Sequence, residues 1–333
     1  MLLIVFLLFG SLLCICSCNP QNESIEPGLN RLNLNWDCNI DKGSEYIVVI
    51  GDIQEYTNGN TYKSYYGATM DWILSQHILG ANIRCVLQTG DITNLNTVNQ
   101  YDIFYQYTLP VAKYLPYVAC IGNHDYTWDS DFKINGRNQT LFSNYTSFKL
   151  TDSLVVARFE DHKMENVVVQ IEILGEILYI LSLEFGPRAE VLEWAKSFVM
   201  KHQNERFILM THEFLTGKGG RICSGSYAER QLRNTTWSSP EQVWQRLVKD
   251  NDNIFCVLCG HNGFFTYLLS ENANGRLVPQ ILFNLQYQEN GGDGWVQLWE
   301  FPQNSDSVSI RVYNTLSREW NNDAGELKFR YKY

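Results

Sequence analysis

Five short polar clusters carry residue types that commonly bind metal ions. They are Gly51-Asp52, Gly90-Asp91, Gly122-Asn123-His124-Asp125, Thr211-His212 and Gly260-His261. Carboxylate and amide oxygens together with imidazole nitrogens suit a divalent cation that keeps open positions for water. Each cluster alone is a weak signal, because Gly-Asp is common in turns and a lone His is more often structural. Their order and placement along the chain indicate a shared site.

Short apolar runs precede all five clusters and predict buried strands. These runs occupy residues 46–50, 83–87, 117–121, 207–210 and 254–258. Helical spacing over residues 63–80 and 97–114 separates the first three, and this β-α-β-α-β order favours parallel strands with helical crossovers. Ligands gather at the carboxyl ends of the strands in such sheets. We therefore expect the polar clusters to converge in space.

The chain after residue 125 begins with a less regular pattern. We expect, in order, a long loop, a hairpin, a helix and a second loop at residues 126–165, 167–183, 189–203 and 216–238. Ser239, Pro240 and Gln242 then form a capping-box pattern that predicts the start of a helix. Further strands are expected at 264–270, 277–286, 295–301 and 307–314. One domain over residues 45–333 is the simplest interpretation.

The order of the five clusters resembles that of the calcineurin-like metallophosphoesterases, and the similarity spans residues 51–263. Its most specific part is Gly122-Asn123-His124-Asp125, since such a run rarely arises by chance. The resemblance implies an α/β fold, namely a four-layer α/β/β/α sandwich of two mostly mixed β-sheets flanked by helices. It also implies two divalent metal ions at the strand ends, and the sequence leaves their identity open among Mn, Zn, Fe, Ca and Mg.

The same resemblance assigns the metal ligands. Asp91 would bridge the two ions, and Asp52 would bind one of them. The other ion would be bound by Asn123, His212 and His261. This second set is complete, so the resemblance implies one tight site.

Two departures from the family pattern affect the remaining ion. Gln54 stands where the family usually has His, as in exported bacterial variants with a Gly-Asp-x-Gln start, and Gly263 replaces the last His of Gly-His-x-His. The Gln54 amide oxygen is a poorer possible ligand, so the second site is expected to be weak. Glu213 and Asp293 are candidate replacement ligands, because carboxylates suit harder ions. They could equally be a surface acid and a turn residue.

Residues of the third polar cluster and the loop after it could act on a substrate. The resemblance implies that His124 faces the substrate and assists the leaving oxygen, with Asp125 orienting it. Arg137 could bind a phosphate oxygen, although a solvated loop Arg is the alternative. Tyr126 and Trp128 could form an apolar wall for an organic leaving group or could anchor the loop.

These features favour metal-dependent hydrolysis of phosphoester bonds by a metal-activated water, as a phosphatase or phosphodiesterase. The alternative is a metal- or phosphate-binding protein on the same fold, in which one metal site has lost too many ligands for turnover. A metallohydrolase for amides or esters is a third possibility, but Gly-x-Ser-x-Gly and HExxH motifs are absent. The formal net charge of −10 argues against nucleic acid as a general partner. A phosphorylated small molecule or macromolecule is the expected substrate.

The first 18 residues form an apolar run that is typical of an export signal. Ile15-Cys16-Ser17-Cys18 resembles the lipobox of bacterial lipoproteins, so Cys18 is expected to be lipidated and residues 19–44 to form a tether and lead-in. An ordinary secretory signal and a retained anchor are the alternatives, since the run has no Lys or Arg. The predicted location is outside the cytoplasm, on the periplasmic side or the cell surface, with membrane contact only through the lipid.

Six cysteines follow Cys18, and export would permit disulfides among them. Cys85, Cys120 and Cys256 lie within apolar runs, where buried thiols acting as small hydrophobes are the favoured interpretation. Cys256 and Cys259 form a lone CxxC without a second pair. A zinc knuckle or a redox site there is therefore only weakly indicated.

Overall fold

The computed structural model describes residues 32–332, in which two seven-stranded sheets dominate. The first sheet has the order β15-β14-β13-β1-β2-β3, and β16 also pairs with β14. Its strands are β1 Ser44–Ile50, β2 Asn82–Gln88, β3 Tyr117–Ala119, β13 Trp295–Pro302, β14 Ser307–Asn314, β15 Glu319–Trp320 and β16 Glu326–Arg330. β1, β2 and β3 run parallel, whereas β13 is antiparallel to β1. The parallel order agrees with the β-α-β-α-β pattern of the sequence.

The second sheet has the order β11-β12-β10-β8-β7-β6-β5. Its strands are β5 Val155–Arg158, β6 Val167–Ile173, β7 Glu176–Ser182, β8 Arg206–Met210, β10 Ile254–Cys259, β11 Phe265–Glu271 and β12 Leu277–Phe283. β7, β8, β10 and β12 are parallel, so their carboxyl ends share one edge. A small separate ladder joins β4 Ile134–Asn135 to β9 Leu232–Arg233.

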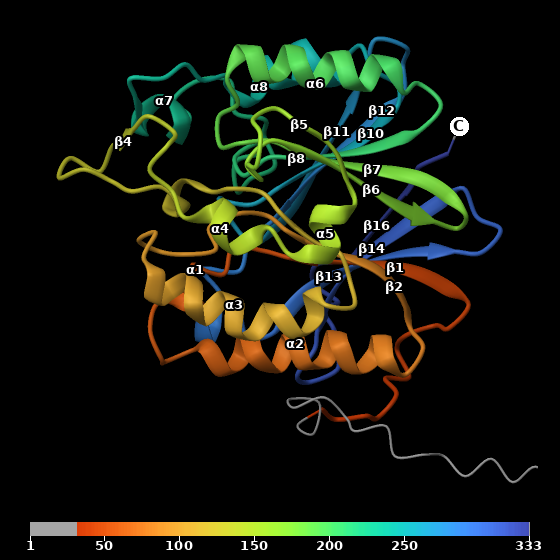
Figure 1. Ribbon diagram of the computed structural model, residues 1–333. Helices are drawn as coiled ribbons and strands as arrows, with labels where there is room; N and C mark the ends of the chain where they lie inside the picture. The colour runs from red at the N-terminus through yellow and green to blue at the C-terminus, as the bar shows by residue number, and fades with distance from the viewer. Residues whose placement is uncertain (1–31, 333) are drawn as a thin grey trace, which may run out of the picture. The chain divides into compact units, whose positions relative to one another are not determined.

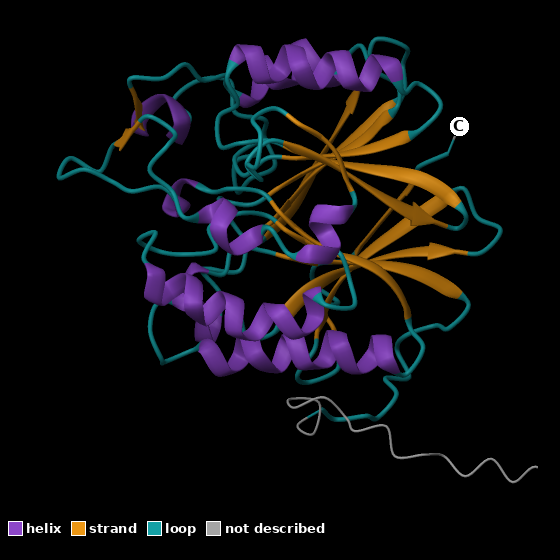
Figure 2. Cartoon of the chain, in the orientation of Figure 1, coloured by secondary structure: helices purple, strands orange, loops and turns teal. Residues whose placement is uncertain are grey.

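Helices cover the outer faces of the two sheets (Figures 1 and 2). α2 (Lys63–Ile78) and α3 (Val98–Ala112) lie beside the first sheet, and α6 (Ala189–Lys201) and α8 (Pro240–Val243) lie beside the second. On α6 the buried Val191, Ala195 and Val199 recur every four residues and pack with the side chains of the second sheet. Between the sheets, the Ser182 hydroxyl donates to the carbonyl of Ala119 at 3.1 Å. The prediction of an α/β fold is confirmed.

Several predicted elements differ from the structure. The expected loop at 126–165 contains β4, α4 (Phe142–Thr146), α5 (Lys149–Ser153) and β5, and the loop at 216–238 contains α7 (Tyr227–Gln231) and β9. Ser239 does form the capping box with Gln242, but α8 passes after one turn into a π-helical turn at Trp244–Val248. The short elements α1 (Gln54–Thr57), η2 (Asn123–Asp125) and η4 (Glu289–Gly291) complete the described part.

The lead-in before β1 packs on the fold at Asp37, after the exposed residues 33–35. Asp37 is buried, and its carboxylate accepts hydrogen bonds from Trp72 Nε1 on α2 and from the Tyr313 hydroxyl on β14. The expected signal at residues 1–18 and the start of the tether lie outside the described residues. Within residues 32–332, no helix is long and apolar enough to cross a membrane.

The cysteines of the described part are all free thiols. Cys85, Cys120 and Cys256 are buried, as the apolar runs predict. Burial raises the pKa of each of these thiols, which keeps them protonated and inert. Cys256 and Cys259 therefore act as core residues of β10, and the CxxC spacing has no metal or redox role in this structure.

Candidate metal centre

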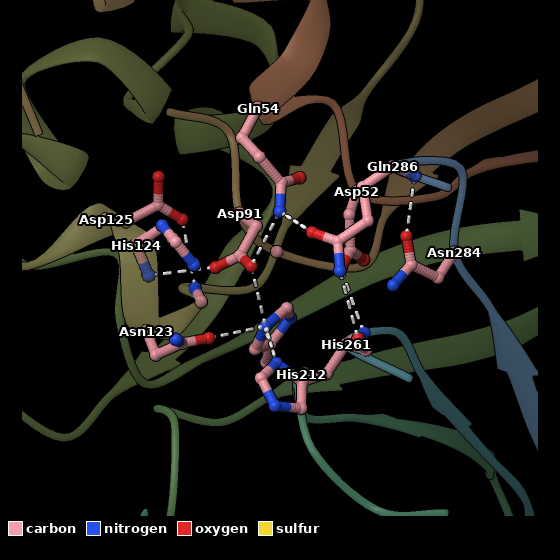
Figure 3. Close-up of polar contacts among 12 residues, drawn as sticks. Asp52, Gln54, Asp91, Asn123, His124, Asp125, His212, His261, Asn284 and Gln286 are labelled. Atoms are coloured by element: carbon pink, nitrogen blue, oxygen red, sulfur yellow. Dashed lines mark hydrogen bonds and ion pairs between the residues drawn. The ribbon is translucent and has the colours of Figure 1, made fainter. Parts of the chain in front are cut away.

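The strand ends bring the predicted ligands together, as Figure 3 shows. Asp52 follows β1, Asp91 follows β2, and Asn123 lies just beyond β3 in the first sheet. His212 and His261 follow β8 and β10 in the second sheet. One donor atom from each of Asp91, His212 and His261 lies within 4.8 Å of the others. The two parallel strand sets thus supply one common cluster, as the sequence predicts.

Several acceptor atoms converge on the Nε2 atom of His212. Asp91 Oδ2 lies 3.3 Å away, and Asn123 Oδ1 and His261 Nδ1 each lie 3.1 Å away. The other ring nitrogen, Nδ1, is 2.8 Å from the carbonyl of Thr89, which can only accept, so Nδ1 carries a hydrogen. Once a metal displaces the proton on Nε2, His212 turns a lone pair toward the same point as these other electron-rich atoms. A divalent cation satisfies all of them at once.

His261 faces this point through Nδ1. Its other ring nitrogen, Nε2, is buried without a hydrogen-bond partner among the described residues and points away from the cluster around His212 Nε2. The oxygen and nitrogen donors of Asp91, Asn123, His212 and His261 therefore fit the metal that the family pattern implies.

The charges of the cluster act strongly on one another. Burial disfavours the charged form of His212, but the carboxylates of Asp91 and Asp52 outweigh it and raise its pKa to about 10. Burial and the charge on His212 lower the pKa of His261 to about 3. Burial works against ionisation of Asp91 as well, yet His212 and His124 hold its pKa below the ordinary value. The ligands thus present a carboxylate, a neutral imidazole and an imidazole whose proton a metal must displace.

Glycines in the clusters allow the ligand loops to approach closely. A Cβ atom on Gly90 would lie 2.4 Å from His212 Nδ1, one on Gly122 would lie 2.1 Å from Asp91 Oδ1, and one on Gly260 would lie 2.1 Å from Asp52 Oδ1. Each glycine therefore makes room for a ligand from another strand. Asp91 and His261 themselves have positive φ angles of 50° and 70°, and such backbone strain concentrates at functional sites.

Asp52 joins the two halves of the cluster. Its Oδ2 accepts from the backbone N–H of His261 at 2.9 Å, and its Oδ1 accepts from the Thr89 hydroxyl at 3.1 Å. It is fully buried, and burial together with the nearby charge of Asp91 raises its pKa. The predicted ligand is therefore in place beside Asp91.

Gln54 also reaches the cluster, and it meets a residue that sequence reasoning missed. The Gln54 side-chain amide donates from Nε2 to Asp91 Oδ2 at 3.2 Å and to Gln286 Oε1. Gln286 follows β12 closely, and the neighbouring Asn284 is fully buried. The predicted strand at 277–286 ran three residues beyond the true end at Phe283. This error hid two polar side chains at the carboxyl end of another parallel strand.

His124 lies at the edge of the cluster with its orientation fixed. Its backbone N–H donates to Asp91 Oδ1 at 2.9 Å, and its Nδ1 is 2.9 Å from the carbonyl of Asn94. The indole of Trp128 packs on the imidazole and donates from Nε1 to the carbonyl of Asn123 at 2.8 Å. Because Nδ1 is engaged with a carbonyl, Nε2 is the nitrogen available to a substrate.

Asp125 does not orient the imidazole of His124 as the resemblance implies. Its carboxylate accepts from the backbone N–H groups of Thr93 at 2.9 Å, Gly122 at 3.0 Å and Ile92 at 3.2 Å. Burial and the charge of Asp91 outweigh these bonds and raise its pKa to about 6. Asp125 ties the loop after β3 to the loop after β2 and so positions His124 through the backbone.

Arg137 is committed to the protein rather than turned to a substrate. Its guanidinium donates to the carbonyls of Phe185, Gly186 and Thr236, and it lies 3.6 Å from the carboxylate of Glu184. This arrangement matches neither of the interpretations drawn from the sequence, which were a phosphate-binding Arg137 and a solvated loop Arg137. Arg137 holds three loops together.

The other candidate residues have structural partners as well. Glu213 accepts from the backbone N–H groups of Tyr227 and Ala228, and Asp293 accepts from the side chain of Asn290. Both carboxylates are therefore used within loops, and neither belongs to the donor cluster of Asp91, His212 and His261. Tyr126 is buried as a loop anchor, whereas Trp128 contacts His124.

The family model of the calcineurin-like phosphoesterases matches residues 46–265, well over half of the chain. The chain therefore belongs to the calcineurin-like phosphoesterase family. The matched range contains all five polar clusters, so the resemblance seen in the sequence is confirmed.

Individual relatives are distant. The uncharacterized protein YvnB of Bacillus subtilis (strain 168) is 24% identical over 283 residues, covering 82% of this chain and 20% of the relative. The chain thus spans about one fifth of the length of that relative.

The similar solved structures include the NAD nucleotidase of Haemophilus influenzae, with 12% identity, a TM-score of 0.42 and coverage of 83% of this chain and 53% of that one. They also include a predicted phosphoesterase of Streptococcus pneumoniae TIGR4, with 9% identity, a TM-score of 0.35 and coverage of 86% and 98%.

Proposed function

We propose that this protein hydrolyses phosphoester bonds with the help of a divalent metal ion. The observation that carries the proposal is the convergence of Asp91, Asn123 and both histidines on one point, with His124 at its edge. When bound there, a divalent metal would lower the pKa of a water and neutralise charge on the phosphoryl oxygens.

The protein's own residues would position and protonate the substrate. His124 in its protonated form would keep Nδ1–H on the carbonyl of Asn94 and present Nε2–H to the leaving oxygen. Trp128 packs on this ring and would limit its rotation. Asp125 would hold the loop that carries it through the backbone bonds described above.

A second candidate function is metal or phosphate binding without turnover. It is favoured by one observation, the pair of amides from Gln54 and Gln286 in a region where the family pattern has histidines. The N-terminal run supports a further proposal, that the protein is exported and anchored through lipid on Cys18. Incorporation of labelled palmitate, lost in Cys18→Ala, would support the anchor, and equal labelling of both would contradict it.

Hydrolysis assays on two model esters would test the proposed function. Metal-stripped protein would be given Mn²⁺, Zn²⁺, Ca²⁺ or Mg²⁺ and offered p-nitrophenyl phosphate or bis-p-nitrophenyl phosphate. We expect turnover that depends on metal and falls in His124→Ala. The preferred ester then distinguishes a phosphatase from a phosphodiesterase. Full metal binding without turnover of these or natural phosphoesters would instead support the binding protein.

A further inference from the structure

Phe132 is an exposed aromatic residue held in a strained backbone conformation. It is 69% exposed, and its φ angle of 57° lies in the left-handed region that bulky side chains disfavour. A glycine would adopt this conformation without strain, and the exposed ring gains little burial in return for it. Strained residues of this kind concentrate at functional sites. The conformation of Phe132 therefore favours a role in contacting a ligand.

The hairpin that carries Phe132 is closed by its own hydrogen bonds. The backbone N–H of Phe132 donates to the carbonyl of Asp129 at 3.0 Å. The Asp129 carboxylate accepts from the backbone N–H groups of Asp131 and Lys133 at 2.9 Å each, and from the Asn135 side chain at 3.1 Å. These bonds hold the exposed ring in position before a ligand arrives, so little ordering remains to oppose binding.

Three rings connect the metal cluster to the tip of this hairpin. The indole of Trp128 packs on the imidazole of His124, with ring centroids 4.5 Å apart. The ring of Phe132 lies 6.0 Å from the same indole, with the ring planes inclined by 81°. Nε2 of His124 is the nitrogen that would meet the leaving oxygen of a phosphoester. The organic group attached to that oxygen would therefore extend toward Trp128 and Phe132.

α7 supplies another aromatic ring at the opposite side of the cluster. The ring centroid of Tyr227 lies 4.3 Å from that of His261, and the guanidinium of Arg230 lies 4.0 Å from the Tyr227 centroid. Figure 3 shows His124 and His261 on opposite sides of Asp91. The ladder between β4 and β9 holds the hairpin beside α7. The metal cluster is thus flanked by aromatic rings, and the charge of Arg230 suits an anionic substrate.

We propose that Trp128 and Phe132 form a subsite for a planar aromatic leaving group of the phosphoester, such as the base of a nucleotide or a simple aryl group. Stacking against aromatic side chains needs only the face of a ring, so both kinds of group fit the same surface. A small polar alcohol would leave Phe132 uncovered. This inference rests on the proposed function, because the subsite binds the group that hydrolysis releases.

Paired esters that differ by one aromatic ring test the subsite. Adenosine 5′-monophosphate is compared with ribose 5-phosphate, and 2-phenylethyl phosphate with ethyl phosphate, because each pair shares the type of leaving alkoxide. Methyl diesters of the same alcohols replace them if the protein hydrolyses only diesters. We expect kcat/KM to be about 10-fold higher or more for the ring-bearing ester. Preference in the first pair alone identifies a nucleobase, in the second alone a simple aryl group, and in both any aromatic ring.

Variants assign the preference to Phe132. Phe132→Ala should lower kcat/KM for the ring-bearing ester about 5-fold more than for its partner ester. Phe132→Gly should do the same without lowering the melting temperature, since glycine relieves the strain at this position, whereas a ring retained for packing would give a lower melting temperature. Tyr114→Ala is the control, because Tyr114 is an aromatic residue 41% exposed beyond the end of α3, and it should behave as wild type.

A binding measurement separates the subsite from the proposed function. Phosphonates carry a carbon–phosphorus bond that hydrolysis does not cleave, so calorimetry compares 3-phenylpropylphosphonate with propylphosphonate on metal-loaded protein. We expect about 5-fold tighter binding of the phenyl compound, lost in Phe132→Ala. Equal rates and equal binding within each pair, or a ring preference that Phe132→Ala keeps, would overturn the subsite and leave the proposed function standing. Ring-dependent binding without hydrolysis of any ester would do the reverse.

Discussion

The imidazole of His124 packs against the indole of Trp128, with ring centroids 4.5 Å apart and ring planes inclined by 46°. The indole is itself fixed, because its Nε1–H donates to the carbonyl of Asn123 at 2.8 Å. A candidate metal ligand, an aromatic ring and the proposed acid are thus linked over six residues of chain. This short path couples the position of His124 to the metal cluster.

Loss of the proposed acid should reduce the chemical step. We expect His124→Ala to lower kcat by about 10²–10⁴-fold, the range typical of a positioned general acid, with metal content unchanged. The control is His202→Ala, because His202 is also partly exposed, has Nδ1 2.8 Å from a backbone carbonyl and stacks on Phe198 at 4.1 Å. Steady-state kinetics on both variants checks this. Equal losses in both would mean that His124 acts only in packing.

Trp128 should affect kcat more than KM. Trp128→Ala frees the imidazole of His124 and is expected to lower kcat by about 10–100-fold, since small misplacements of a reacting group are costly. Trp128→Phe keeps the ring contact, loses only the bond to Asn123 and should retain more activity. Trp194→Ala serves as a control, because Trp194 packs on Phe159 beside α6. An unchanged kcat in Trp128→Ala would contradict the positioning role.

Gly122 tests the tight approach of the strand-end loops. A methyl group there would lie 2.1 Å from Asp91 Oδ1 and 2.3 Å from the Asp91 backbone nitrogen. We expect Gly122→Ala to destabilise the fold by about 1–3 kcal/mol through overpacking and to weaken metal binding. Gly220→Ala should do neither, since the nearest atom to its new Cβ lies 3.5 Å away. Thermal unfolding and metal titration are the measurements, and normal metal affinity in Gly122→Ala would refute this account.

Metal affinity should rise with pH. The pKa of His212 is raised to about 10, so a proton occupies the ring at neutral pH and competes with the metal. His261, with a pKa of about 3, is already neutral there. Affinity should therefore increase by about tenfold per pH unit from pH 7 to 9, with about one proton released per metal. Calorimetry in buffers of different ionisation enthalpy measures that proton, and affinity independent of pH would contradict the assignment.

The raised pKa of His212 should make the metal-free fold less stable as the pH rises, the opposite of its effect on metal affinity. Since the pKa of His212 lies above its unfolded value, its charged form stabilises the native state fully below about pH 6.5. That stabilisation is lost as the pH rises through about 10. Denaturant unfolding of metal-free His212→Asn should lack this pH dependence, and a wild-type curve that is flat up to pH 10 would argue against it.

Arg137 should prove structural. Its charged donors hold the carbonyls of Phe185, Gly186 and Thr236, so Arg137→Ala is expected to lower the free energy of unfolding by about 1.5–3 kcal/mol. The KM of the remaining folded protein should change little. Arg233→Ala, at an exposed Arg with surface carboxylates as partners, should leave stability near that of wild type. A large rise in KM for Arg137→Ala with normal stability would restore the phosphate-binding role.

The convergence of the candidate ligands was predictable through two different signals. Parallel strands of one sheet end at one edge, so the topology predicts that Asp52, Asp91 and Asn123 meet after β1, β2 and β3. His212 and His261 follow strands of the other sheet, so strand order alone could not bring them to Asp91, and the family resemblance supplied that step.

The loops could not be predicted because tertiary contacts define them. The residues from 126 to 165 lack periodicity, yet α4 and α5 form there. The Ser143 hydroxyl donates to Glu165, and Thr151 bonds the backbone of Tyr117 in both directions. Gln286 was missed for a similar reason, since apolar residues before and between the polar ones disguised the end of β12. The side-chain partners of Arg137 lie in such loops, so they could not be predicted either.

The most direct test is a titration of metal-stripped protein with Mn²⁺ while bound metal and the hydrolysis rate of the preferred p-nitrophenyl ester are measured together. Asp91→Asn is compared with Asp37→Asn, a buried Asp outside the cluster. We predict that the wild type and Asp37→Asn gain rate as metal binds, and that Asp91→Asn loses both. Hydrolysis by the stripped protein in chelator, or full metal binding and turnover in Asp91→Asn, would contradict the account.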